Sequence, residues 1–137
     1  MIKFKDCIVF LLAKGNQKAH RNLKKRLKSY GLTPVQALVL GALEEENGLT
    51  ASEIGRRLGL DNATVSGVLD RLRESSWIVK KPDPQDRRTQ LICLPEKSDG
   101  NMIKKLYKAR REANEETLQN LSVEERVLLR RLLKDLV

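Results

Sequence analysis

Residues 50–94 carry the pattern that decides the fold, and they read TASEIGRRLGLDNATVSGVLDRLRESSWIVKKPDPQDRRTQLICL. The first four residues are a capping box, in which a hydroxyl and a carboxylate satisfy free N–H groups at a helix start. Gly59 ends that short helix, and Asp61 or Asn62 caps the next one. An apolar stripe at helical spacing follows, formed by Val65, Val68, Leu69 and Leu72. The stretch therefore predicts two helices joined by a tight turn, the second over about residues 62–75.

The residues after this helix pair predict a β-hairpin over about residues 77–94. Trp77-Ile78-Val79 begins the first strand, and the run from Thr89 to Leu94 is rich in β-forming residues. A charged loop of turn-forming residues lies between them, Pro82-Asp83-Pro84-Gln85-Asp86-Arg87-Arg88. The hairpin therefore has a long tip that carries two adjacent arginines.

Two helices are predicted before this stretch. One runs from about Lys5 to Lys28, and Gly31 closes it. The other opens at the capping box Thr33-Pro34-Val35-Gln36, with its proline in the first turn, where a missing N–H costs nothing. Its end, Glu44-Glu45-Glu46, opposes the helix dipole, so we expect this end to fray or to be paired.

Two more helices are predicted after the hairpin, one over about residues 96–120 and one from the capping box Ser122-Val123-Glu124-Glu125. The fold class is mainly α with a small β-hairpin wing, in a single domain over residues 1–137. We expect a winged helix-turn-helix over 31–94. The apolar residues of the flanking helices, 1–30 and 96–137, exceed what that unit can cover, so we expect them to be dimerisation helices.

Charge points to a polyanionic partner. The chain has 27 Lys+Arg against 18 Asp+Glu, for a net charge of +9, and a pI of about 9.8. Residues 1–30 hold nine basic residues and one acidic residue, whereas residues 62–94 hold six and four. The strongest positive charge therefore lies in the N-terminal helix and not in residues 62–94.

Several classes of protein are disfavoured. No run of 18 apolar residues exists, and the apolar run Cys7–Ala13 stops at Lys14, so we expect no membrane span, no secretory signal and a cytoplasmic location. Two cysteines and one histidine provide neither a disulfide framework nor a zinc site. The sequence also lacks a nucleophile motif and a phosphate-binding glycine loop, so we expect no enzyme activity, cofactor or metal.

A helix pair followed by a basic hairpin predicts a winged helix-turn-helix that binds double-stranded DNA. One helix fits the major groove, and a basic loop reaches the neighbouring minor groove. The candidate DNA contacts are Asn62, Ala63, Thr64, Ser66, Arg71, Arg73, Arg87 and Arg88. A bare carboxylate near phosphates is repelled, so we expect Asp70 to pair with Arg88 and aim it, with Asp86 organising the wing.

The chain resembles the MarR-type regulators of bacteria and archaea. The resemblance covers about residues 31–94 and rests on these stretches: Gly31–Gln36, Leu49–Ile54, Leu58-Gly59-Leu60, Ala63–Leu72 and the wing signature Asp83–Arg88. It implies an obligate homodimer on a pseudo-palindromic operator, with the arginine that matches Arg88, or its neighbour Arg87, probing the minor groove. It also implies release by a small aromatic or anionic effector, for which Phe10 and His20 are candidates by location. Departures occur at Ser75-Ser76-Trp77, at Gly67 and at Pro95.

Two alternatives stay open. A subset of the family senses peroxides through a cysteine near the N-terminus, which makes Cys7 a candidate redox residue, whereas Cys93 is predicted to be structural. The other alternative is a winged helix that binds nucleic acid without sequence preference, with a steep salt dependence on any duplex.

Overall fold

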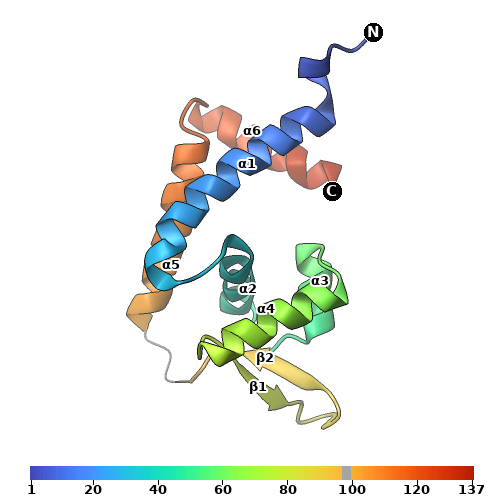
Figure 1. The fold of residues 1–137 in the computed structure, drawn as a ribbon, viewed down its shortest axis with the longest axis vertical. Coiled ribbons are helices and arrows are strands. Elements are labelled where there is room, and N and C mark those ends of the chain that lie inside the picture. Colours follow the sequence, from blue (N-terminus) through green and yellow to red (C-terminus); the bar gives the residue numbers. More distant parts are fainter. Residues whose placement is uncertain (97–99) are drawn as a thin grey trace. The chain divides into compact units, whose positions relative to one another are not determined.

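The computed structural model describes residues 1–96 and 100–137 (Figure 1). Its elements, in chain order, are η1 (Phe4–Asp6), α1 (Ile8–Leu27), η2 (Lys28–Tyr30), α2 (Pro34–Glu45), α3 (Ala51–Leu58), α4 (Asn62–Glu74), β1 (Val79–Pro82), β2 (Gln90–Cys93), α5 (Gly100–Thr117) and α6 (Val123–Leu136). The chain forms two compact units, Met1–Arg26 with Lys108–Val137 (the helical unit) and Leu27–Tyr107 (the winged unit). No helix in the described part is long and apolar enough to cross a membrane.

All three predicted capping boxes are present. In α3, the Thr50 hydroxyl accepts from the Glu53 N–H at 3.1 Å, and the Glu53 carboxylate accepts from the Thr50 N–H at 3.0 Å. The same reciprocal pairs open α2 and α6. At α4, Asp61 is the cap, because its carboxylate accepts from the Thr64 N–H at 2.7 Å. The helix starts are therefore fixed by residues within four positions of one another.

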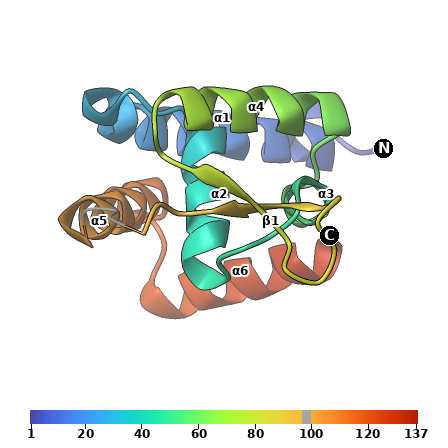
Figure 2. The same ribbon diagram turned by 90° about the horizontal axis from the view of Figure 1, so that it is seen from below.

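The winged unit buries one apolar core between α2, α3, α4 and the hairpin (Figure 2). Its fully buried side chains include Leu40, Leu43, Ile54, Leu69, Leu72, Ile78 and Ile92. The strands β1 and β2 are antiparallel, with Val79 opposite Cys93 and Pro82 opposite Gln90. Cys93 is buried, as expected of a structural residue.

The turn between α3 and α4 depends on two glycines. Gly59 has φ +67°, a left-handed conformation that side chains with a Cβ disfavour. At Gly55, a Cβ would lie 3.1 Å from the Leu60 carbonyl oxygen and 3.2 Å from Val65 Cγ2. A side chain at Gly55 would therefore require its neighbours Leu60 and Val65 to shift by a few tenths of an ångström.

A backbone bridge that the sequence did not reveal ties the hairpin to the segment before α3. The Ile92 N–H donates to the Leu49 carbonyl at 2.7 Å, and the Leu49 N–H donates to the Ile92 carbonyl at 3.2 Å. The Asn47 side chain also accepts from the Leu94 N–H at 2.8 Å. These bonds hold the base of the wing against the start of the helix pair.

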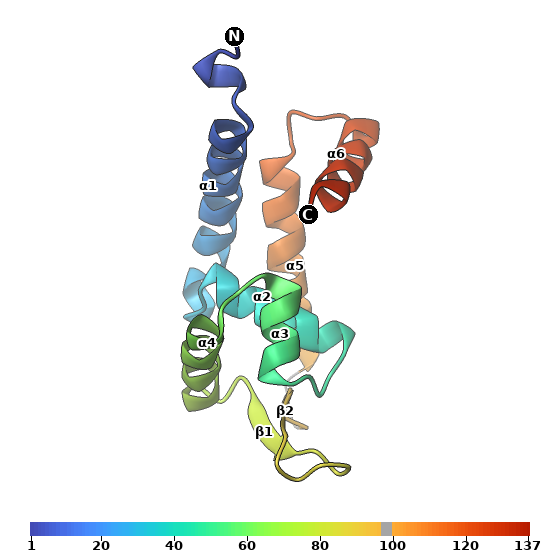
Figure 3. The ribbon, with the colours of Figure 1, turned by 90° about the vertical axis from the view of Figure 1, so that its right-hand side faces the viewer.

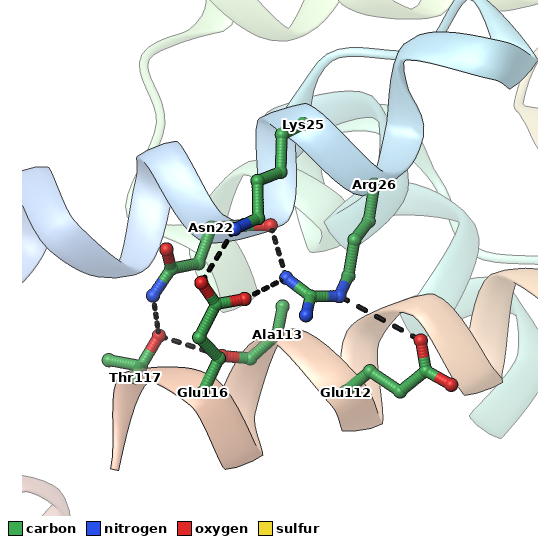
Figure 4. A network of polar contacts seen from close by, with 7 residues as sticks. All are labelled: Asn22, Lys25, Arg26, Glu112, Ala113, Glu116 and Thr117. Carbon is green, nitrogen blue, oxygen red and sulfur yellow. Dashed lines mark hydrogen bonds and ion pairs between the residues drawn. The ribbon is translucent and has the colours of Figure 1, made fainter. Parts of the chain in front are cut away.

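In the helical unit, α1 and α5 run antiparallel and are joined by a polar network (Figures 3 and 4). Lys25 Nζ lies 2.6 Å from a Glu116 carboxylate oxygen, and Arg26 ion-pairs with the other oxygen. Arg26 Nε also lies 3.8 Å from Glu112, and the Asn22 amide donates to the Thr117 hydroxyl at 3.0 Å. Glu116 is therefore the carboxylate on which two α1 cations converge.

We expect the contribution of Glu116 to stability to disappear in acid. Hydrogen bonds from Lys25 and from Arg26 lower the pKa of this carboxyl below its ordinary value. A lowered pKa in the folded state stabilises the fold above the ordinary pKa, and this contribution is lost as pH falls through the lowered value. Glu116→Gln should therefore lower the melting temperature more at pH 6 than at pH 3. Equal destabilisation at both values would contradict the ion-pair explanation, and Glu124→Gln, at an exposed carboxylate of α6, is the control.

The bounds of two predicted helices differ from the structure. The helix expected over Lys5–Lys28 is interrupted by an extended residue, Cys7, and ends in a 3-10 turn over Lys28–Tyr30. Lysines at a helix start oppose the dipole, which disfavours a continuous helix through Lys5. The helix predicted over about 96–120 spans Gly100–Thr117; residues 97–99 of that prediction lie outside the described residues.

Candidate nucleic-acid interface

The helix α4 separates its buried and exposed residues as the sequence predicted. Val65, Leu69 and Leu72 are buried in the core of the winged unit, and Val68 is half-buried. The candidate DNA contacts of this helix are all exposed: Asn62, Ala63, Thr64, Ser66, Arg71 and Arg73. Gly67 is exposed too, and a Cβ there would have no atom within 4 Å. The exposed face is therefore small and polar at its start and carries charges of both signs toward its end, with Arg71 and Arg73 beside Asp70 and Glu74.

Thr64 takes part in the cap as well as in the exposed face. Its backbone N–H and its hydroxyl both donate to the Asp61 carboxylate, the hydroxyl at 3.0 Å. These two hydrogen bonds lower the pKa of the Asp61 carboxyl, which stays ionised near neutral pH. Because the hydroxyl proton is used in the cap, Thr64 offers DNA its hydroxyl lone pairs and its methyl group.

Asp86 organises the tip of the wing. Its carboxylate accepts from the Arg88 N–H at 3.1 Å and from the Thr89 hydroxyl at 3.2 Å. A backbone bond from the Asp83 N–H to the Thr89 carbonyl, 2.9 Å long, closes the loop. The side chains of Arg87 and Arg88 are exposed. The loop therefore has a defined backbone, and it presents two guanidinium groups.

One of the two acidic residues of α4, Asp70, is paired with the wing, but through a lysine. Asp70 Oδ1 lies 3.7 Å from Nζ of Lys80, which is on β1. The Asp70 side chain is 52% exposed and that of Lys80 is 28% exposed, so the pair is partly screened by solvent. The pairing of Asp70 with Arg88 and the wing-orienting role of Asp70 stay predictions, and the cation nearest to Asp70 in this structure is Lys80.

Two arginines at the end of α3 were missed by the sequence reasoning. Arg57 ion-pairs with Glu46, which raises the pKa of its guanidinium and satisfies the acidic end of α2 that was expected to fray or to be paired. Arg56 is exposed beside it and has no ion-pair partner within the described ranges. The sequence signal that could have identified them is their position in the last turn of the first helix of the pair, where the helix dipole stabilises cations.

The residues considered for effector or redox roles lie in the helical unit. Phe10 packs against Phe4, with ring centroids 4.6 Å apart, and Lys14 Nζ lies 6.0 Å from the Phe10 ring centre. His20 is exposed and Cys7 is half-buried. A groove of about 550 Å³ lies in this unit, and its lining includes Leu11, Leu12, Ala19, Leu118 and Leu133.

Comparisons with known proteins agree with this geometry. A model of the MarR family matches residues 30–89. The multiple antibiotic resistance protein MarR of Salmonella typhimurium is 31% identical over 124 residues, which cover 89% of this chain and 85% of that protein. The transcriptional repressor NicR of Pseudomonas putida is 27% identical over 93% of this chain and 80% of its own. For regulators from Bacillus subtilis and Staphylococcus epidermidis, the chain spans 66% and 61% of the relative's length.

Solved structures extend the likeness to almost the whole chain. A probable transcriptional regulator from Pseudomonas aeruginosa has a TM-score of 0.88 and 32% identity, covering 98% of this chain and all of that one. A MarR mutant from E. coli in complex with operator DNA has a TM-score of 0.80 and 25% identity, covering 95% and 93%.

The fold and the site together define a winged helix-turn-helix protein of the kind that regulates transcription. The chain belongs to the MarR family.

Proposed function

We propose that this protein is a sequence-specific transcriptional regulator, a repressor that binds a pseudo-palindromic DNA operator as a homodimer. The observation that carries the proposal is the pairing of a small, polar α4 face with an arginine-tipped wing whose backbone Asp86 organises. A helix of this kind enters the major groove, and the arginines reach a minor groove. The operator complex of the E. coli relative and the repressor name of the Pseudomonas putida relative support the proposal.

Selection of bound sequences from random duplex DNA tests this function. We expect an inverted repeat whose half-sites lie about one helical turn, roughly 10 bp, apart from centre to centre. Thr64→Ala and Ser66→Ala should change which bases are preferred, since these residues face the groove in the proposal. Recovery of random sequences, combined with a steep salt dependence on every duplex, would favour the winged helix without sequence preference.

The homodimer is proposed from apolar surface that a single chain leaves exposed. Helix α6 has no buried residue, although half of its length is apolar. Its exposed apolar residues are Val123, Val127, Leu128, Leu132, Leu133 and Leu136. The apolar groove lined by α1, α5 and α6 lies in the same unit. Exposed apolar surface of this kind marks a protein interface, and a second copy of the chain covers it in this proposal.

Leu132→Glu is expected to convert the dimer into a monomer and to lower operator affinity at least tenfold. The substitution places a charge in apolar surface that the partner covers, and a monomer loses the avidity of the second half-site. Size-exclusion chromatography with light scattering and operator titration measure the two effects. Arg131→Glu, at an exposed neighbour on the same helix, is the control. A Leu132→Glu variant that remains dimeric would remove this face of α6 from the interface.

Release from DNA by a small aromatic or anionic effector is part of the proposal. The selected operator should be titrated with phenolic compounds and with peroxide. A loss of binding in peroxide that Cys7→Ser abolishes would favour the redox alternative, and a loss with a phenolic compound that Cys7→Ser leaves intact would favour the ligand.

A further inference from the structure

The exposed side of α1 carries a row of cations that the winged-helix function does not use. Lys14, Lys18, Arg21 and Lys25 follow one another at separations of four, three and four residues, which places them on one face of the helix. Lys24 lies beside them, and α1 contains no acidic residue. Lys14, Arg21, Lys24 and Lys25 are exposed, and Lys18 is half-buried.

Four of these cations are not neutralised by the fold. Within residues 1–96 and 100–137, Lys14, Lys18, Arg21 and Lys24, here called the α1 basic face, form no ion pair with an acidic side chain. Some cations elsewhere have acidic partners, among them Lys25, Arg26, Arg57, Lys81 and Arg126, whereas Arg56 is an isolated cation without one in the described part. Like charges three or four residues apart on a helix destabilise it by about 0.2–0.5 kcal/mol a pair. The α1 basic face therefore carries a repulsion that the fold does not offset.

Helix electrostatics explains only part of this arrangement. Lys24 lies in the last turn of α1, where a cation is favoured by the dipole. The dipole effect falls off within a turn, so it does not account for Lys14, Lys18 and Arg21 in the middle of the helix.

The face is separate from the apolar surface that we assign to the dimer. The groove is lined by Leu11, Leu12, Gly15, Asn16 and Ala19 of α1. At 100° a residue, the centre of this set lies about 130° around the helix from Lys14 and about 150° from Arg21 and Lys24, whereas Lys18 lies about 90° from it and borders the groove. A second copy seated on the groove therefore leaves Lys14, Arg21 and Lys24 open to another partner, with Lys18 at the edge.

We infer that the α1 basic face binds the phosphate backbone of duplex DNA, as a second contact beside the winged helix. From Lys14 to Lys24 the helix spans about 15 Å, which matches about four phosphates of one strand at 3.4 Å each along the axis. This inference rests on the proposed function, because the winged helix supplies the local concentration of DNA at which weak phosphate contacts form.

A membrane surface fits the same cations less well. A helix that binds at a lipid interface must insert an apolar face. In α1 the exposed apolar residues Leu11 and Leu12 line the groove that we assign to the dimer, and Asn22 and Arg26 contact α5. Binding to an anionic membrane is therefore the alternative that the experiment below distinguishes from DNA binding.

The test replaces Lys14, Lys18, Arg21 and Lys24 together with glutamine. Glutamine is a good helix former, and the change removes the repulsion, so α1 is expected to fold at least as well. We expect affinity for a non-cognate duplex at 50 mM salt to fall at least tenfold. The slope of log K against log salt should fall by about 0.9 for each cation that contacts a phosphate. Operator preference over other sequences should be retained, because phosphate contacts carry no sequence information.

A matched control removes the same charge from exposed positions elsewhere, with Lys104, Lys108, Arg131 and Lys134 changed to glutamine. Equal losses in the two variants would show an effect of net charge alone and would overturn the inference. An unchanged slope in the α1 variant, with wild-type protein still selecting its operator, would overturn the inference and leave the proposed function standing. Wild-type protein that binds no duplex at 50 mM salt would contradict both. A loss of binding to phosphatidylserine vesicles without any loss on DNA would assign the face to membranes and would also overturn the inference.

Discussion

Replacing Arg88 with alanine is expected to reduce operator affinity by about 1–3 kcal/mol, or roughly fivefold to more than a hundredfold. Arg88 is exposed at the tip of a loop whose backbone Asp86 holds through the Arg88 N–H. The substitution therefore removes a guanidinium group and leaves the loop in place. Fluorescence anisotropy with the selected operator measures the change, and light scattering verifies that the dimer is intact.

The matched control for Arg88→Ala is Arg131→Ala, which removes an exposed arginine from α6. Arg87→Ala, measured in the same titration, separates the two wing arginines. If Arg88→Ala and Arg131→Ala bind equally well, the wing has no part in the mechanism, and the proposed interface is reduced to α4.

Gly67→Ala is expected to stabilise the free protein and to weaken operator binding at the same time. Glycine within a helix costs roughly 0.5–1 kcal/mol relative to alanine, and a Cβ at Gly67 meets no atom within 4 Å. The variant should therefore melt a few degrees higher. In the proposed complex the same methyl group lies between α4 and the base edges, so operator affinity should fall about tenfold or the preferred bases should change.

A non-cognate duplex is the control for Gly67→Ala, because binding to it depends on phosphates and not on the fit in the groove. A variant with a higher melting temperature and full operator affinity and preference would show that Gly67 does not approach the bases. Equal losses on both duplexes would instead indicate a general change in α4.

Asp70 shows which part of this site could be predicted from the sequence alone. The exposed carboxylate on α4 predicted a pair with a wing arginine, Arg88, and that pair stays a prediction; the structure places Lys80 of β1 3.7 Å from Asp70. The identity of this cation was not accessible from the sequence, since residues 62–94 contain six basic residues of similar chemistry. Which of them reaches Asp70 depends on how the hairpin packs against α4. In this structure Lys80 pairs with Asp70, and Arg88 is exposed at the tip.

The sequence by itself determined the features that depend on neighbours along the chain. The capping boxes at Thr33, Thr50 and Ser122 and the buried stripe of α4 connect residues within about four positions or one helical face. Their hydrogen bonds form wherever the helix forms, so the local pattern is sufficient to predict them.

Only the tertiary structure decided the features that join distant segments. The Leu49–Ile92 bridge, the Glu46–Arg57 pair and the convergence of Lys25 and Arg26 on Glu116 each depend on how separate elements pack. Many charged residues have the right chemistry for such contacts, and packing selects among them. The cations of the α1 basic face are visible in the sequence, but only the packed helices show that the fold leaves them without acidic partners within residues 1–96 and 100–137.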